Sequence, residues 1–302
     1  MKVIHKIDPN LLRRSVNVTV VGAGGTGSAL LPRLMQLHHA LIALGHPGGL
    51  DVCVYDGDTV SEANIGRQGF FPSDVGQYKA TVLVNRLNMC WGTQWEAYPQ
   101  RINKSDRIRT DIIIGCVDTR KARAAILGCV ANAHVYYLDC GNGQNSGQVV
   151  IGEIGGPSTM KRCDRLPSVA DLFPEAVNPD LDATDDAPSC SVAEALEKQS
   201  LVVNMAMATA AFNLLWTLFR EGGLNYSGQF INLKTGMTAP IRMDTAVWER
   251  LGYKAPVPKQ RVRRKVLKVA EVGTAPEGAG PTEAAVTNED AVPAPEEMAL
   301  AA

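Results

Sequence analysis

Short apolar runs alternate with longer amphipathic stretches over the first half of the chain. The apolar runs predict strands, with one weaker candidate given last: 16–21, 50–55, 111–117, 135–140 and 95–99. The amphipathic stretches predict helices: 28–44, 75–88 and 121–132. Strands that alternate with helices are typical of an α/β fold, in which helices cover both faces of a mostly parallel sheet.

The pattern changes in the second half of the chain. Residues 148–154 predict another strand, and the polar, proline-rich residues 155–189 predict a long crossover loop. Residues 192–220 then predict a helix, and the two short runs at 228–233 and 239–243 predict a C-terminal β-hairpin. The uncharged part of the helix, Leu201 to Phe219, contains Asn and Thr residues, which favours a buried helix over a membrane span.

The last part of the chain differs in composition. Residues 259–268 carry six Lys or Arg, whereas 274–302 contain Ala, Pro, Gly and Glu with no Lys or Arg. Such a segment buries too little apolar area to offset the entropy of ordering it. We therefore predict a folded domain over 1–255 and a disordered tail over 256–302. The basic stretch is compatible with a nucleic-acid contact or an acidic partner, but a solvated linker is the favoured interpretation.

Composition limits the classes of function. The chain has 302 residues, 45% of them hydrophobic and 20% charged, which indicates a globular protein. A net charge of −1 provides no general basic field for nucleic acid or a membrane surface. Seven cysteines without regular spacing, together with no apolar signal region at the N-terminus, predict a cytoplasmic protein with free thiols.

A glycine-rich loop lies between the first predicted strand and helix. Gly22, Gly24 and Gly27 form the pattern G-x-G-x-x-G, which lets the backbone approach phosphate groups at a helix N-terminus. The loop alone does not distinguish NAD from ATP. Asp56 ends the second strand, where it is placed to bind ribose hydroxyls, although it is also compatible with capping a turn.

The residues after Asp56 favour ATP. Arg67 and Lys79 are cations suited to stabilising the charge that develops when the bond between the α- and β-phosphates breaks. A hydride-transfer enzyme has little use for them there. Asp118 ends another predicted strand, where its carboxylate is placed to hold magnesium, but Asp is also a favoured helix N-cap.

Four ordered blocks resemble one known family. The runs VVGAGGTGS, YDGDTVSEANIGRQ, GQYKA and GCVDTR, between residues 20 and 120, resemble the ThiF/MoeB/HesA family, relatives of ubiquitin-activating enzymes. The later runs PSCSVAEAL and GQFINLKTG resemble the ThiF-type proteins of PRTRC gene clusters. The resemblance implies a Rossmann-like, doubly wound fold. It also implies an ATP-dependent adenylyltransferase that activates the C-terminal carboxylate of a small ubiquitin-like (β-grasp) carrier protein.

The resemblance also implies roles for individual residues. Asp56 would hold the ribose, Asp118 would hold magnesium, and Gln68 would lie close by. The residues implied to contact the nucleotide or its phosphates are Gly22, Gly24, Gly25, Gly27, Asp58, Asn64, Arg67 and Lys79. Of these sites, Arg67, Lys79 and Asp118 are the expected catalytic residues.

Cys190 is the candidate nucleophile. In several members of the family a cysteine in this region accepts the activated carboxylate as a thioester. Ser191 and Glu194 fit a capping box, which would place the thiol at a helix N-terminus and favour its thiolate. A small packing residue is the alternative interpretation.

Two further expectations come from the family. Many members bind zinc with Cys-x-x-Cys pairs, which this chain lacks, so no zinc is predicted. Members also form homodimers in which an N-terminal Arg reaches the neighbouring site; Arg13 and Arg14 are the candidates here. A conjugating-enzyme-like partner is a further implied contact.

Two other functions remain open at this point. A non-catalytic nucleotide-binding scaffold predicts a degraded phosphate site, which the presence of Arg67 and Lys79 argues against. An NAD-dependent oxidoreductase predicts a catalytic His, but none of the five histidines ends a predicted strand.

Overall fold

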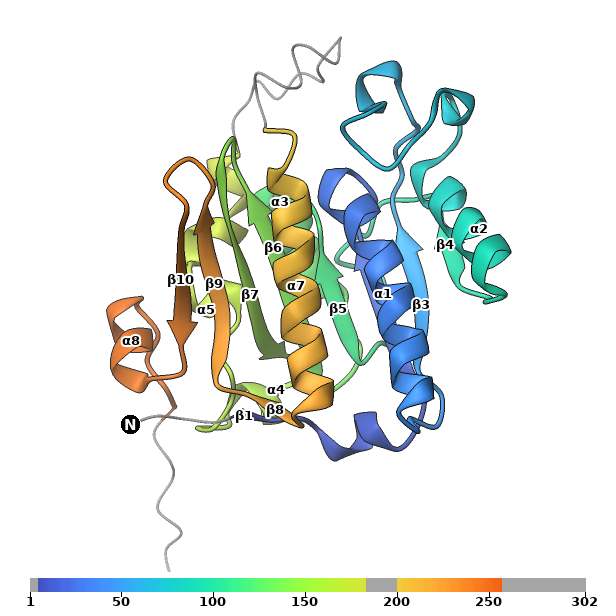
Figure 1. Ribbon diagram of the computed structural model, residues 1–302. Coiled ribbons are helices and arrows are strands. Elements are labelled where there is room, and N and C mark those ends of the chain that lie inside the picture. Colours follow the sequence, from blue (N-terminus) through green and yellow to red (C-terminus); the bar gives the residue numbers. More distant parts are fainter. Residues whose placement is uncertain (1–4, 183–199, 257–302) are drawn as a thin grey trace, which may run out of the picture. The chain divides into compact units, whose positions relative to one another are not determined.

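A computed structural model describes residues 5–182 and 200–256 (Figure 1). Their main feature is an eight-stranded sheet. In spatial order its strands are β10 (Met237–Arg242), β9 (Tyr226–Asn232), β7 (Ser146–Ile154), β6 (Val135–Asn142), β5 (Ile112–Gly115), β2 (Val16–Val21), β3 (Leu50–Tyr55) and β4 (Glu96–Tyr98). A separate antiparallel pair is formed by β1 (His5–Lys6) and β8 (Gly223–Leu224).

The sheet has a parallel half and an antiparallel half. Strands β6, β5, β2, β3 and β4 run parallel, so their carboxyl ends lie at one edge. Strands β7, β9 and β10 continue the sheet in antiparallel pairs. The parallel strand β5 is buried at every residue, as expected for a strand that is covered on both faces. The predicted Rossmann-like α/β fold and the C-terminal hairpin are therefore confirmed.

Helices cover both faces of the sheet (Figure 1). Helices α1 (Gly25–Ala43), α2 (Lys79–Trp91) and α7 (Val203–Arg220) lie on one face, with α1 in contact with both of the others. Helix α3 (Arg120–Cys129) lies on the other face. The remaining short helices are α4 (Pro157–Met160), α5 (Val169–Leu172) and α8 (Thr245–Arg250). This arrangement leaves the N-termini of α1 and α3 at the edge where the parallel strands end.

Helix α7 is shorter than the sequence predicts. It begins at Val203, and residues 201–202 form a turn. Residues 192–199 lie outside the described part of the chain. The helix packs against α1 and against strands β6 and β7, which explains its apolar composition. None of the helices in residues 5–182 and 200–256 is long and apolar enough to cross a membrane.

The crossover region contains short elements that the sequence pattern does not predict. Besides α4 and α5, it includes the 3-10 turns η4 (Pro174–Val177) and η5 (Pro179–Leu181), which pack against α3. Helices of three or four residues are too short to show a periodic pattern, so proline at their first positions is the available signal. The proposed tail, 256–302, lies outside the described residues except for its first residue.

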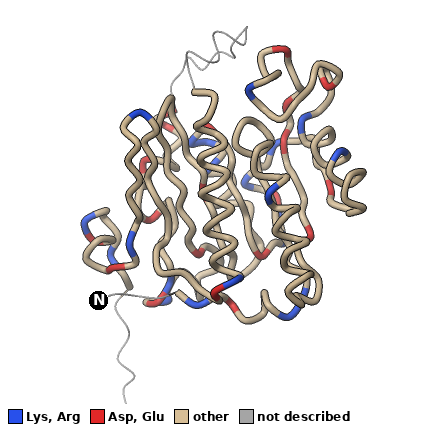
Figure 2. The backbone as a smooth tube through the Cα atoms, in the orientation of Figure 1, with Lys and Arg blue, Asp and Glu red and all other residues tan. Residues whose placement is uncertain are grey.

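Charged residues of both signs are mixed over the fold. Figure 2 shows Lys and Arg interspersed with Asp and Glu along the described chain. This mixture gives the described part no single-sign field for a polyanion.

Candidate nucleotide site

The glycine loop joins β2 to α1 through a backbone path that side chains would block. Gly22 has a φ of +96°, and a Cβ at this position would collide with the carbonyl of Cys116 at the end of β5. A Cβ on Gly27 would collide with the carbonyl oxygen of Gly22. The first and third glycines of the motif are therefore required for the close packing of strand, loop and helix.

This packing predicts a stability difference between two glycine substitutions. Gly22→Ala should lower the free energy of unfolding by about 1–3 kcal/mol, because the backbone is strained and the methyl group has no space. Gly45→Ala is the matched control: its φ is +89°, but nothing lies within 4 Å of the added Cβ. Urea unfolding of both variants measures the difference. Equal losses would show that the contact with Cys116 does not constrain the loop.

The N-terminus of α1 follows the glycine loop and has no side-chain cap. Its N-cap is Gly24. The first N–H groups of a helix have no partner within the helix, and together with the helix dipole they favour a bound anion. A Cβ on Gly24 would lie 4.0 Å from Oε1 of Gln68, so this glycine faces the loop around Gln68. An uncapped helix N-terminus of this kind is suited to phosphate oxygens.

Helix α7 supports the first turn of α1. Oδ1 of Asn204 accepts hydrogen bonds from Oγ1 of Thr26 at 3.0 Å and from Nδ2 of Asn142 at 2.6 Å. A Cβ on Gly25 would collide with the Asn204 side chain. The second half of the chain therefore fixes the phosphate loop through a residue that the sequence analysis did not identify.

Asp56 ties the end of β3 to the glycine loop. Its Oδ2 accepts a hydrogen bond from the Ala23 N–H at 2.6 Å, and its Oδ1 accepts one from the Asp58 N–H at 2.8 Å. Burial raises the pKa of Asp56, against the effect of these hydrogen bonds. The carboxylate thus holds a turn, as the alternative interpretation expects. Each of its oxygens has a second lone pair, which leaves it able to accept a ribose hydroxyl as well.

Asp58 and Lys79 form an ion pair beside the loop. Nζ of Lys79 lies 3.5 Å from Oδ2 of Asp58, and the Lys79 side chain is 10% exposed. Arg101, which follows β4, donates a hydrogen bond of 2.8 Å to Oδ1 of the same carboxylate. Burial raises the pKa of Asp58, but the Arg101 hydrogen bond and the Lys79 charge outweigh it, so its pKa lies below the usual value. The sequence analysis did not identify Arg101.

Asn64, Arg67 and Gln68 lie on the segment between β3 and α2. Oδ1 of Asn64 accepts hydrogen bonds from the N–H and Oγ of Ser61. The group of Asn64 that would donate to a phosphate is therefore its side-chain amide nitrogen. Burial lowers the pKa of Arg67. Oε1 of Gln68 is buried and has no hydrogen-bond partner among the described residues. Next to it, the N–H of Gly69 donates to Oγ of Ser28, which places this segment against the first turn of α1.

Asp118 follows β5 and is exposed. The N-cap of α3 is Thr119, whose side chain accepts a hydrogen bond from the Ala122 N–H at 3.2 Å, so the interpretation of Asp118 as the cap is wrong. The Asp118 carboxylate makes no hydrogen bond or ion pair with residues 5–182 or 200–256. The pKa of Arg101 is raised mainly by its hydrogen bond to Asp58 and, more weakly, by the charge of Asp118. The charge of Asp118 thus acts on Arg101, the residue that pairs with Asp58.

A comparison with protein-family models shows which family the chain belongs to. The model of the ThiF family matches residues 3–245. The chain belongs to the ThiF family. No curated protein matches it. The fold is also similar to crystal structures of E. coli MccB, one with ATP and one with MccA-N7isoASN, at 17% and 16% identity and a TM-score of 0.49 in both cases. Each match covers 76% of this chain and 64% of MccB, so the chain spans less than two thirds of these proteins.

The residues of this ThiF-family protein fit ATP and magnesium. The uncapped α1 N-terminus and the orphaned Oε1 of Gln68 provide polar groups for a nucleotide. No group of three or more His, Cys, Asp or Glu that could hold a metal is found in the described residues. A single carboxylate, that of Asp118, together with phosphate oxygens is how Mg²⁺ is commonly held. Cys190, the candidate nucleophile, lies outside the described residues.

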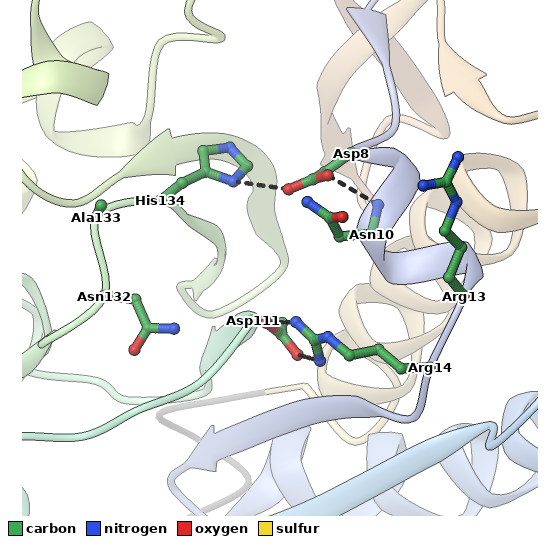
Figure 3. A pocket seen from close by; sticks show the side chains of 8 residues that line it. All are labelled: Asp8, Asn10, Arg13, Arg14, Asp111, Asn132, Ala133 and His134. Atoms are coloured by element: carbon green, nitrogen blue, oxygen red, sulfur yellow. Dashed lines mark hydrogen bonds and ion pairs between the residues drawn. The ribbon is translucent and has the colours of Figure 1, made fainter. Parts of the chain in front are cut away.

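A pocket at the opposite edge of the sheet contains the two N-terminal arginines of this ThiF-family protein (Figure 3). Arg14 donates two hydrogen bonds of 2.7 Å to Asp111 at the start of β5, so its guanidinium is held within its own chain. The Arg13 side chain makes no such bond with the described residues. Of the two residues expected to reach a neighbouring subunit, Arg13 is the one whose side chain is available.

Proposed function

We propose that this protein is an ATP-dependent adenylating enzyme that activates a carboxylate. The observation that carries the proposal is the composition of one edge of the sheet. There, the glycine loop after β2 leads into the uncapped N-terminus of α1, and the two neighbouring strands, β3 and β5, lead to the buried cation of Lys79 and to the unpaired carboxylate of Asp118. Membership of the ThiF family supports the proposal.

In the proposed reaction, negative charge develops on the phosphates, and the positively charged groups of the site would stabilise it. A substrate carboxylate oxygen attacks the α-phosphorus of ATP, and the bond from that phosphorus to the bridging oxygen breaks. The electron pair leaves with pyrophosphate, and an acyl adenylate remains. Arg67 and Lys79 would stabilise the charge on the α-phosphate and on the leaving group, and the α1 N-terminus would bind phosphate oxygens. Magnesium, when bound at Asp118, supplies further neutralisation of phosphate charge.

The substrate and the later steps are finer proposals that come from the family resemblance. The carboxylate would be the C-terminus of a small ubiquitin-like carrier protein, and Cys190 would accept it as a thioester. In that transfer the thiolate attacks the acyl carbon and AMP leaves. The working enzyme would be a homodimer.

The thioester step has its own test. With the carrier, the wild-type protein should form an adduct that reductant cleaves, whereas Cys190→Ala should form none and keep pyrophosphate exchange. If Cys190→Ala still supports both adenylation and onward transfer, the nucleophile is another group.

Pyrophosphate exchange tests the adenylation step. Labelled pyrophosphate should enter ATP only when a carrier protein with a free C-terminal carboxylate is present, because the reverse reaction needs the acyl adenylate. A carrier that ends in a carboxamide is the control. A lack of exchange with every co-encoded β-grasp protein would contradict the proposal and favour a non-catalytic scaffold. A thermal shift with NAD but not with magnesium and ATP would favour an oxidoreductase.

A further inference from the structure

The crossover region approaches the N-terminus of α3, directly beside Asp118. Asp182 lies half-buried at the end of the described crossover segment. Its Oδ1 accepts a hydrogen bond from the Arg120 N–H and its Oδ2 accepts one from the Lys121 N–H, both at 2.9 Å. These are the first two N–H groups of α3, so a carboxylate 62 positions away satisfies donors that Thr119 alone leaves open.

The side chain of Arg120 strengthens the same connection. Its Nε donates to the carbonyl of Glu175 at 3.0 Å, and its Nη1 donates to the carbonyl of Leu181 at 2.9 Å. Nη1 also lies 3.6 Å from Oδ1 of Asp182. Although burial raises the pKa of Asp182, the N–H groups of Lys121 and Arg120 outweigh it and hold its pKa below the usual value. The carboxylate is therefore charged at neutral pH and held in place.

The turn between β5 and α3 is fixed from its inner side as well. Nη2 of Arg123 donates to the carbonyl of Val117 at 3.0 Å, and its Nε donates to Asp139 at 2.9 Å. Asp139 is fully buried on β6. Between the bonds from Arg123 and those from Asp182, the Asp118 side chain makes no hydrogen bond to the described residues. Its position therefore follows the backbone of the turn.

We propose that Asp182 is a positioning residue that holds the turn of Asp118 in the geometry needed to bind magnesium with ATP. The inference rests on the proposed function. Without the Asp182 carboxylate, the first turn of α3 loses two hydrogen bonds, and the Arg120 guanidinium loses the negative charge that offsets its own. Both changes reduce the affinity of Asp118 for a divalent cation, the second by leaving an unbalanced positive charge two positions away from it.

The test measures metal binding rather than activity. Mn²⁺, whose free form gives a strong electron paramagnetic resonance signal, is titrated into protein that holds α,β-methylene ATP. Asp182→Ala should weaken Mn²⁺ binding by roughly 10-fold. Asp182→Asn, which keeps one acceptor oxygen, should give an intermediate loss. The matched control is Asp180→Asn, since Asp180 is exposed, lies two positions away and removes the same charge.

The outcomes separate the positioning role from the proposed function. Circular dichroism establishes that each variant is folded. Unchanged Mn²⁺ affinity in folded Asp182→Ala overturns the positioning role, as does an equal loss in Asp180→Asn. Wild-type protein that binds the nucleotide but no Mn²⁺ overturns the metal site itself, and wild-type protein that binds neither overturns the proposed function with it.

Discussion

Arg67→Ala should lower the rate of pyrophosphate exchange by about 10³-fold or more, with a much smaller effect on ATP binding. The Arg67 side chain is half-buried, and burial lowers its pKa, so its charge is partly removed from water. A fixed cation in such surroundings stabilises the charge that develops in the transition state more than it stabilises bound ATP. The exchange rate at saturating ATP, compared with the ATP concentration for half-maximal rate, separates the two effects.

Arg109→Ala is the matched control for this prediction. Arg109 is also a loop arginine, but it is exposed and lies before the start of β5, away from the edge of the glycine loop. This variant removes the same charge and should exchange pyrophosphate at the wild-type rate. An Arg67→Ala enzyme that keeps its maximal rate and only needs more ATP would show that Arg67 binds the ground state alone.

Asp118→Asn should lower exchange by about 100- to 1000-fold, since a metal that neutralises phosphate charge contributes several kcal/mol to the transition state. The substitution keeps the size of the side chain and removes the charge that would hold magnesium. Because the carboxylate is exposed and has no bond to the described residues, the free energy of unfolding should change by less than about 0.5 kcal/mol. Exchange is measured over a range of magnesium concentrations, next to urea unfolding.

Asp51→Asn provides the control for Asp118, since Asp51 is an exposed carboxylate on β3. High magnesium should recover part of the loss in Asp118→Asn and should leave Asp51→Asn unaffected. If Asp118→Asn exchanges at the wild-type rate at every magnesium concentration, Asp118 has no role in holding the metal.

The central parallel strands could be predicted closely from the sequence. The predicted bounds of β2 and β3 agree with the structure, because these strands are compact apolar runs bounded by polar or glycine residues. Helix α8 was missed because it is only six residues long, although Asp244 caps it through the Ala246 N–H and Trp248 is buried. Within the described residues, α7 begins only at Val203, although the helical pattern already includes residues 200–202, where the Ser200 N–H donates to the Gln144 carbonyl.

The site could be predicted only where the residues form a local motif. The glycine loop and Asp56 are adjacent to strand ends, and the structure brings them into contact through the Ala23 N–H. Asp118 and Thr119 are both favoured N-caps, and a pattern of residue types does not decide between neighbours. Arg101 belongs to the site because it pairs with Asp58, and Asp182 because it binds the N-terminus of α3. Both contacts depend on tertiary structure, so no local pattern predicts them.

The most direct test of the account is a crystal structure of the protein with magnesium and a non-hydrolysable ATP analogue. The account predicts phosphate density over the loop Gly22–Gly27 at the N-terminus of α1, with Arg67 and Lys79 within hydrogen-bond reach of it and the metal at Asp118. Nucleotide density elsewhere, or Arg67 and Lys79 turned away from the phosphates into solvent, would contradict it.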